Sequence, residues 1–556
     1  MSERIETHPC AGPLRRPPGE VMRLARLGAF HATRLSFMQV LLRRLASEGW
    51  RFSRTLWQID AGGVGRAVYS VHGPERAYSL VAFAHDLPDD QRSDRVIATA
   101  WDATFALFDG VPGEADLARL AANVPLQEAG RVSNRELSLS RANRSVRLFE
   151  HVVARLADGR QPDAAEVGSV GYLMRTTAVY GSGKFGAADR ARIATRPELS
   201  APFQAEMLSV WLTRAFTLDL AEHLAAMRGG ARAAALAPEL RRRVGVGNST
   251  GLGMAPFLVN HPVLLNNWIA AREEALARVR AVPAATPGTV AGFRAALAAA
   301  RENARDWTSA HPLQQEKLAA LRAELDAVAA HVTGGALAGP APWDRLWRWG
   351  GDHLSLEGQE ALLALLLEPH GPLVDDLAAT MAADEDAAFR IDGAMATDRL
   401  AALLREVYGW ALDIDYDQPE HCARFWYVSE EKLEPRLGER HAEPGADHEQ
   451  PLATGRDAQA LARALAAWTG PPTVAAFLMA HPAHRHTVRR AQIAARHPYS
   501  EIRDNLISAE LMPIDLLRCK LSFFGAARFD PRSDRWVRIC MYQGAPFPHE
   551  LLAPGP

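Results

Sequence analysis

Three short runs near the N-terminus, RTLWQIDA (54–61), RAVYSVHG (66–73) and RAYSLVAFAH (76–85), decide the expected fold. They are rich in Val, Tyr and other aromatic residues, they alternate in part between apolar and polar positions, and Gly-containing turns separate them. This pattern is typical of consecutive antiparallel strands. The sequence therefore predicts a small antiparallel β-meander between Arg54 and Ala84.

Helical patterns surround the meander and dominate the rest of the chain. Strand character returns at the end, where KLSFFGAARF and RWVRICMYQ flank a PRSD turn and predict a β-hairpin. The expected fold class is α+β, predominantly helical, with a small antiparallel β-meander near the N-terminus and a C-terminal β-hairpin. Apolar spacing predicts helices at 35–50, 114–122, 147–156, 201–227, 262–282, 290–305, 313–331, 358–367 and 398–408.

The chain is long enough for several domains. Its 556 residues predict about two to four of them. Two stretches rich in Gly, Pro and Ala, at 282–287 and 334–343, are the best linker candidates. We expect a flexible N-terminal arm, an α+β domain with the meander, a helical domain with two Gly-rich loops, and a helical domain that ends in the hairpin. Their expected ranges are 1–20, 21–165, 166–335 and 336–556.

Composition and charge exclude several classes of protein. Hydrophobic residues make up 48% of the chain and charged residues 23%, which is typical of globular proteins and excludes disordered or coiled-coil chains. The net charge of −2 provides no global field toward nucleic acid or anionic lipid, so we expect neither partner. Four scattered cysteines, no signal sequence and no run of 18 apolar residues lead us to expect a soluble cytoplasmic protein.

The first candidate site is the loop Gly171–Gly186, GYLMRTTAVYGSGKFG. Lys184 is one of only four lysines in the chain, and lysine can lose its proton readily. It follows a Gly-Ser-Gly turn, which lets backbone N–H groups face a ligand. We therefore interpret Lys184 and Tyr180 as catalytic residues, with a plain Gly-rich connector as the alternative. The substrate-binding candidates in this loop are Arg175, Thr176, Thr177 and Ser182.

The second candidate site is the loop Gly245–Trp268, GVGNSTGLGMAPFLVNHPVLLNNW. It enters a helix at Pro262 and suits the presentation of hydroxyl, amide and backbone donors to a small polar ligand. Its order of Ser, Met, Pro, Asn and Pro resembles in outline the signature loop of the fumarase/aspartase lyases, at a different spacing and without the basic residue between Pro and Asn. We interpret Ser249 as catalytic; the alternative is a structural loop with satisfied Asn side chains. The substrate-binding candidates are Asn248, Thr250, Asn260 and His261.

Further candidates lie between and after the expected strands. His85 and Asp86 directly follow the third strand, a common place for functional side chains. Arg92 and Arg95 would share one face of a helix and could bind a carboxylate or phosphate, so we count them as substrate-binding candidates. The stretch 133–145, SNRELSLSRANRS, indicates an edge strand with its arginines on the solvent face. The alternative for these residues is local salt bridging.

Together these residues predict an enzyme that acts on a small polar, anionic metabolite. No zinc-binding, Walker A or dinucleotide-binding motif is present, so we expect no metal or other cofactor. The expected chemistry is proton transfer in elimination, isomerisation or hydrolysis, by a lyase, isomerase or hydrolase. The alternatives are a non-catalytic metabolite-binding protein and a helical interaction or assembly subunit. The substrate, a homo-oligomeric state and a shared pocket for the two Gly-rich loops stay open.

Overall fold

The computed structural model groups the chain into two compact units. The first unit combines 1–35 with 255–522, and the second combines 36–254 with 523–556. Because both units join segments far apart in the sequence, changes in composition along the chain cannot reveal their bounds. The structure describes residues 14–88, 91, 100–126, 132–178, 193, 195–248, 261–307, 312–382, 389–418, 421, 426–429, 435–437, 449–452, 454–503, 513–526, 528–530 and 538–550.

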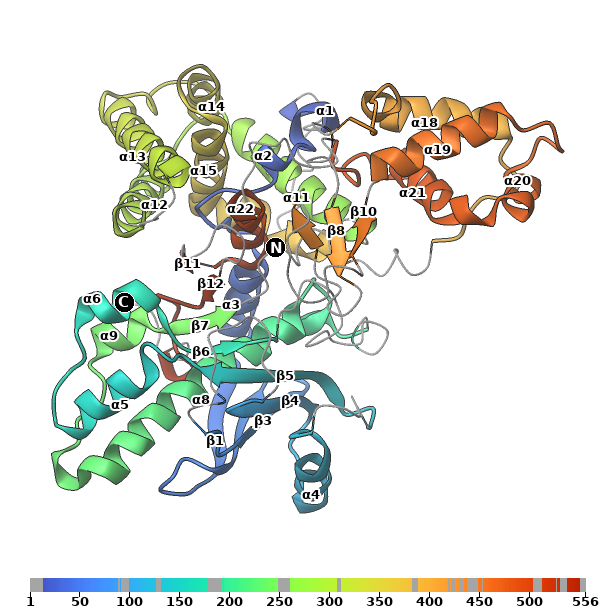
Figure 1. Cartoon of the computed structure of the whole chain (residues 1–556). Coiled ribbons are helices and arrows are strands. Elements are labelled where there is room, and N and C mark those ends of the chain that lie inside the picture. The colour runs from blue at the N-terminus through green and yellow to red at the C-terminus, as the bar shows by residue number, and fades with distance from the viewer. Residues whose placement is uncertain are drawn as a thin grey trace, which may run out of the picture. The chain divides into compact units, whose positions relative to one another are not determined.

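The second unit contains a nine-stranded mixed sheet (Figure 1). Its strand order is β1-β2-β3-β4-β5-β6-β7-β12-β11. Neighbouring strands are antiparallel except for β6 and β7, which are parallel. The strand bounds are β1 Arg51–Ile59, β2 Gly65–His72, β3 Ala77–Ala84, β4 Ala103–Asp109, β5 Glu136–Arg144, β6 Tyr172–Thr176, β7 Gly245–Asn248, β11 Arg528–Asp530 and β12 Arg538–Met541.

The predominantly helical α+β class is confirmed, but the expected extent of the sheet is wrong. β1, β2 and β3 are antiparallel, as the three N-terminal runs predict. They are not a small separate meander, because β4 to β7 continue the same sheet. The C-terminal strands β11 and β12 also join it, since β12 pairs with β7. The run at 520–524, expected in the hairpin, instead ends helix α22 (Pro513–Phe524).

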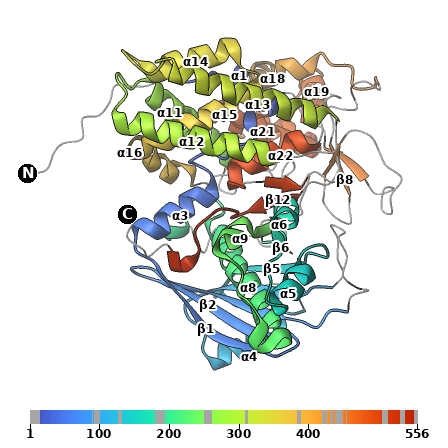
Figure 2. The same ribbon diagram turned by 90° about the vertical axis from the view of Figure 1, so that its left-hand side faces the viewer.

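Helices cover both faces of this sheet. On one face, Phe216 of α8 (Gln204–Gly229) contacts Phe105 of β4, with 5.5 Å between the ring centroids. On the other face, leucines of α4 (Glu114–Asn123) share a buried cluster with Ala106. Phe105 and Ala106 are consecutive in β4, so they point to opposite faces. Figure 2 shows α5 beside α8. The other helices of this unit are α3 Phe37–Ser47, α5 Phe149–Ala157, α6 Ala164–Val170 and α9 Pro238–Arg243.

The first unit is mainly helical. It also contains a three-stranded sheet in the order β10-β8-β9. The strand bounds are β8 Trp426–Ser429, β9 Pro435–Leu437 and β10 Glu449–Leu452. The helices described in this unit include most of α22 and, in chain order, α1 Pro18–Val21, α2 Leu24–Leu27, α11 Pro262–Arg280, α12 Pro287–Asp306, α13 Pro312–Thr333, α14 Pro342–His353, α15 Leu356–Leu367, α16 Gly371–Val374, α18 Thr397–Leu412, α19 Thr454–Ala466, α20 Val474–Ala480 and α21 Arg485–Arg496.

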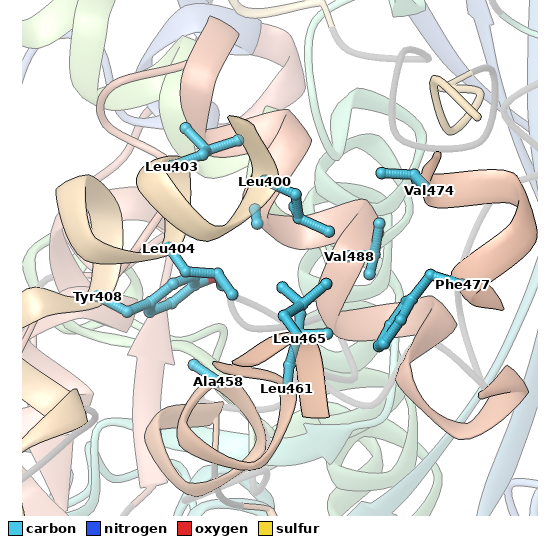
Figure 3. Packing of buried hydrophobic residues seen from close by; sticks show 11 residues of the cluster. Leu400, Leu403, Leu404, Tyr408, Ala458, Leu461, Leu465, Val474, Phe477 and Val488 are labelled. Atoms are coloured by element: carbon cyan, nitrogen blue, oxygen red, sulfur yellow. The ribbon is translucent and has the colours of Figure 1, made fainter. Parts of the chain in front are cut away.

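Four helices of the first unit, α18 to α21, share one hydrophobic core (Figure 3). Leu400 and Leu404 of α18 meet Leu461 of α19, Phe477 of α20 and Val488 of α21, and all five side chains are buried. Each helix contributes an apolar stripe at a spacing of three to four residues. Burial of each such side chain contributes about 1.5–3 kcal/mol. This core therefore holds the four helices together as one cluster.

Buried charges connect the N-terminal segment to two helices of the same unit. Arg16 is only 4% exposed; its Nε donates to Glu273 of α11 at 2.8 Å and its guanidinium also donates to Glu360 of α15 at 2.6 Å. Arg272 lies 3.3 Å from Glu273 and 3.7 Å from Glu360. Burial alone would raise the pKa of Glu360, but the surrounding arginines lower it. Glu360 is therefore ionised, with Arg16, Arg26 and Arg272 as its neighbours, and Glu273 is paired with Arg16 and Arg272.

Candidate functional site

One line of paired residues crosses the sheet of the second unit where several strands begin or end. Ala84, the last residue of β3, pairs with Ala103, the first residue of β4, and Ala103 pairs with Ala142 of β5. Thr176, the last residue of β6, pairs with Ala142 and with Asn248, the last residue of β7. The carboxyl ends of β6 and β7 therefore lie side by side, and Ala142 of β5, the residue beside them, also pairs with the first residue of β4.

The segments expected as Gly-rich loops, 171–186 and 245–268, contain strands β6 and β7, so their first parts are not loop. The register brings the ends of these two strands together. The chain after β6 is described to residue 178, and β7 ends at Asn248. Adjacent strands lie about 4.8 Å apart, so the segments that follow β6 and β7 start from neighbouring positions. In open sheets with parallel strands, ligands bind beyond the carboxyl ends of such strands. Sequence analysis left open whether the two loops share a pocket; the strand ends from which they continue lie side by side.

Six polar side chains share the α4 face of the sheet at this line. Phe83 pairs with Thr104, Thr104 with Arg141, and Asn143 with Arg175, so these residues point to one side. The pairing continues through the bond from His85 N to Asp102 O at 2.9 Å and the bond from Thr177 N to Arg141 O at 3.0 Å. The strand-end cluster, as we call it, consists of His85, Thr104, Arg141, Asn143, Arg175 and Thr177.

The cluster contains two guanidinium groups from neighbouring strands. The Arg141 guanidinium lies over the Trp101 ring, 3.9 Å from the ring centroid. Arg175 is 8% exposed and is paired in register with Asn143. Stacking on an aromatic ring orients a guanidinium, and its planar fork of donors matches the oxygens of a carboxylate or phosphate. The arrangement therefore has the chemistry to bind a small anion.

Asn143 and Asp102 fix the strand ends around these arginines. Asp102 N donates to Asn143 Oδ1 at 3.0 Å, and Asn143 Nδ2 donates to the carbonyl of Ala100 at 3.2 Å. The carboxylate of Asp102 accepts from Arg144 N at 2.8 Å and lies 3.7 Å from Arg144 Nε. Asp102 and Asn143 are both buried. These bonds hold the start of β4 against the end of β5.

His85 is the titratable member of the cluster that can accept a proton. Its Nε2 lies 2.9 Å from Thr104 Oγ1. Burial lowers the pKa of His85, an effect that the nearby Asp102 carboxylate partly opposes. The imidazole is therefore uncharged at neutral pH, as a general base must be. His85 also lines an open hollow of about 390 Å³ together with Phe83 and Arg66. Its position after a strand was the sequence signal, but sequence analysis gave it no role.

Thr176 and Asn248 lie on the opposite face from Arg175. Consecutive strand residues alternate in direction, so Thr176 points to the α8 face, and Asn248 is its register partner. Asn248 Nδ2 donates to the carbonyl of Thr176 at 3.3 Å, and Ala178 N donates to Thr176 Oγ1 at 3.1 Å. The structure thus gathers four predicted binding residues at the strand ends, with Arg175 and Thr177 on one face and Thr176 and Asn248 on the other.

The remaining predicted site residues cannot be compared with this geometry. His261 belongs to the first unit, where it directly precedes α11. The roles assigned to all of these residues stay predictions. Those outside the described residues are Arg92, Arg95, Tyr180, Ser182, Lys184, Ser249, Thr250 and Asn260.

The stretch 133–145 is not the edge strand that the sequence predicts. It forms β5, which pairs with β4 on one side and β6 on the other. Glu136 at its start is fully buried and accepts from Ser133 N at 2.9 Å and from Arg119 at 2.6 Å. Alternation of polar and apolar residues correctly indicates a strand. It cannot show whether a strand has neighbours on both sides, which is why the stretch was taken for an edge strand and its arginines, Arg141 among them, for solvent-facing residues.

Neither a metal site nor a known relative guides the functional assignment. Within the described ranges, no group of three His, Cys, Asp or Glu side chains is placed to hold a metal ion. Among the helices that the structure describes, none combines the length and apolar character needed to cross a membrane. Comparison with protein families, characterised proteins and solved structures finds no match for this chain. The functional argument therefore depends on the strand-end cluster.

Proposed function

We propose that the protein is an enzyme that binds a small anionic metabolite at the strand-end cluster and transfers protons on it. One observation carries the proposal: β6 and β7 end side by side, so both Gly-rich loops start next to Arg141 and Arg175. Two guanidinium groups from neighbouring strands, one of them held against the Trp101 ring, suit a carboxylate or phosphate. The hydroxyl of Thr177, next to Arg141 in the same cluster, adds a polar contact.

The proposed chemistry is elimination, isomerisation or hydrolysis without a nucleotide or redox cofactor. A base that is uncharged at neutral pH must lie near the bound anion. His85 has the lowered pKa that this role requires. Lys184, Tyr180 and Ser249, from the loops that follow β6 and β7, are the other proposed proton-transfer residues. The anion held by the arginines would place its reacting carbon or ester bond between the cluster and these loops.

Binding is tested first, because it needs no assay of the reaction. We would measure the melting temperature of the purified protein with a panel of small carboxylates, phosphates and sulfonates. A ligand at about 100 times its Kd stabilises the folded protein by about 2.7 kcal/mol. We expect at least one anion to raise the melting temperature, and the rise to disappear in Arg175→Met. No stabilising anion in the panel, or an undiminished rise in Arg175→Met, contradicts the proposed binding site.

Proton transfer is tested separately with the anion that binds. Incubation in D2O, followed by proton NMR, detects exchange of carbon-bound hydrogen as well as elimination or hydrolysis products. We expect turnover or exchange in the wild type and its loss in His85→Gln or Lys184→Arg, with binding retained in the variant that removes the true base. Binding without any exchange or product in the wild type would instead favour the alternative of a non-catalytic metabolite-binding protein.

A further inference from the structure

In the first unit, helices α20 and α21 form a pair joined by a short turn. α20 has seven residues, α21 has twelve, and the connection consists of His481 to His484. Thr473 caps α20 by accepting from Ala476 N at 3.3 Å. Phe477 of α20 and Val488 of α21 are anchored in the core shared with α18 and α19 (Figure 3). A helix pair joined by a turn of three to four residues is the arrangement that presents a second helix to the major groove of DNA.

Charge is unevenly distributed around this pair. Residues 458–500 contain five arginines and four histidines but no acidic residue. Arg485, Arg489 and Arg496 are four and seven residues apart, so at 3.6 residues per turn they lie along one side of α21. Arg485 and Arg496 are exposed and Arg489 is half-buried. The stripe spans about 16 Å at a rise of 1.5 Å per residue.

Arg490, the fourth arginine of α21, differs from the other three because it has a structural role. Arg490 donates to both carboxylate oxygens of Glu501, at 2.8 and 2.9 Å, and Glu501 is buried. Arg485, Arg489 and Arg496 have no such carboxylate partner among the residues that the structure describes. The guanidinium groups of Arg489 and Arg496 instead lie over the Phe389 ring, 5.7 and 5.2 Å from its centroid. This contact orients the two groups while their hydrogen-bond donors can still bind oxygens.

We propose that the exposed side of α21 docks on duplex DNA through phosphate contacts made by Arg485, Arg489 and Arg496. The buried side of α21 holds the helix in the four-helix core, so the arginine stripe is presented on a rigid element. The major groove is about 12 Å wide and admits an α-helix. The near-zero net charge of the whole chain led us to expect no nucleic-acid partner. That expectation concerns the average field, whereas phosphate binding depends on local charge.

An acidic protein is the other class of partner that a basic helix could bind. Duplex DNA is favoured because three guanidinium groups lie in line along a helix that follows a short turn, and 458–500 contain no acidic residue. Acidic residues from outside this range that lie against α21 are Asp392, whose main chain bonds Gln492, and Glu501, which is paired with Arg490. Burial raises the pKa of Asp457, the acidic residue that precedes this region, and the positive charges of Arg490, His484 and Arg456 partly oppose this rise. DNA docking is independent of the proposed small-molecule site, which belongs to the second unit.

The test is fluorescence anisotropy of the full-length protein with a labelled duplex of mixed sequence. Three phosphate contacts predict that log K falls with log salt at a slope of about −2.7. In the triple variant Arg485→Glu/Arg489→Glu/Arg496→Glu we expect affinity at 50 mM salt to fall by at least about tenfold and the slope to approach zero. Arg405→Glu, which reverses an exposed charge on α18, is the matched control and should leave both values unchanged.

Circular dichroism and the melting temperature must show that the triple variant is folded. If it is not, Arg489→Gln and Arg496→Gln are measured as single variants. Each is expected to reduce the slope of log K against log salt by about one. The proposal is overturned if the wild type does not bind the duplex. It is also overturned if binding is equal in wild type and triple variant. Binding of polyglutamate but not of DNA, through the same arginines, would show that the surface serves an acidic protein partner instead.

Discussion

The buried charges of the first unit and the strand-end cluster of the second use similar residues in different ways. In the first unit, Arg16 and Arg272 meet the carboxylates of Glu273 and Glu360, so charge is balanced by charge. At the strand ends, Asn143, Asp102 and Thr177 bind main-chain groups of neighbouring strands. The first arrangement stabilises the fold. The second fixes strand ends beside Arg141 and Arg175, and such rigid support is what a binding site requires.

The largest effect is expected from breaking the charge network. In Arg16→Met, two buried carboxylates lose a partner, which should lower the free energy of unfolding by about 3–5 kcal/mol. The adjacent variant Arg15→Met is the control: Arg15 is 43% exposed and pairs with Glu274, so about 1 kcal/mol or less is expected. Urea unfolding followed by circular dichroism measures both. Equal losses in the two variants would show that burial of the network does not matter.

A buried group that stays neutral should make stability depend on pH in a different way from the ion pairs. His31 of the first unit is such a group, because burial keeps its imidazole neutral. Burial lowers the pKa of His31 to about 4, against about 6.5 in the unfolded chain. The unfolded state therefore binds more protons between pH 6.5 and 4, so stability is lost as pH falls through this range and is unaffected above it. Between pH 7 and 5 we expect a loss of about 1–2 kcal/mol from His31. Urea unfolding of His31→Gln should show a smaller loss; an unchanged pH dependence would contradict this explanation.

Widening the gap between β6 and β7 should damage the strand ends. A Cβ at Gly247 would lie 2.9 Å from the Tyr172 ring, so Gly247→Ala forces the two strands apart. We expect a loss of about 1–3 kcal/mol in unfolding free energy and a weaker response to the stabilising anion. Thermal melting with and without that anion measures both. A variant as stable and as responsive as the wild type would mean that this spacing does not position the site.

The smallest change in stability is expected at Thr177. Its hydroxyl accepts from Arg141 N at 3.3 Å and its side chain is half-buried, so Thr177→Val should cost about 0.5–1.5 kcal/mol. A loss of stability alone lowers the melting temperature equally with and without the anion. If the hydroxyl also contacts the ligand, the anion-induced rise in melting temperature itself becomes smaller in Thr177→Val. Thr55→Val, which removes a hydroxyl on β1, is a control that should leave the ligand response unchanged.

Local periodicity predicted the helices well, while distant pairing stayed hidden. α8 and α11 carry long apolar repeats, and both lie where these repeats predict them. β7 has only four residues, GVGN, without a strand pattern, and its partners β6 and β12 lie far away in the sequence. Pairing of this kind depends on long-range register, which single-sequence patterns do not contain. For the same reason the sequence predicted the N-terminal meander as a separate small sheet, although β4 to β7 continue it.

The candidate site was predictable in part for the same reason. Arg175 and Thr177 were chosen because they lie beside a Gly-rich loop with a rare lysine. Arg141 and Asn143 were assigned to an exposed edge, because only the partner β6 reveals that β5 is internal. His85 was placed correctly after β3, but its lowered pKa comes from burial in the folded sheet, an effect that the Asp102 carboxylate partly opposes. These residues come together at one end of the sheet only because the fold pairs their strands, and no single segment of the sequence shows this pairing.

The most direct test of this account is hydrogen exchange, followed by mass spectrometry, with and without the anion that stabilises the protein most. The account predicts slower exchange in peptides that cover both 172–178 and 245–250, together with the peptide that contains Arg141, because one ligand contacts the ends of β6 and β7. Peptides from α18 to α21 should be unchanged by this ligand. Protection of only one of the two strand ends, or protection confined to the first unit, would contradict the claim that the strand-end cluster is the binding site.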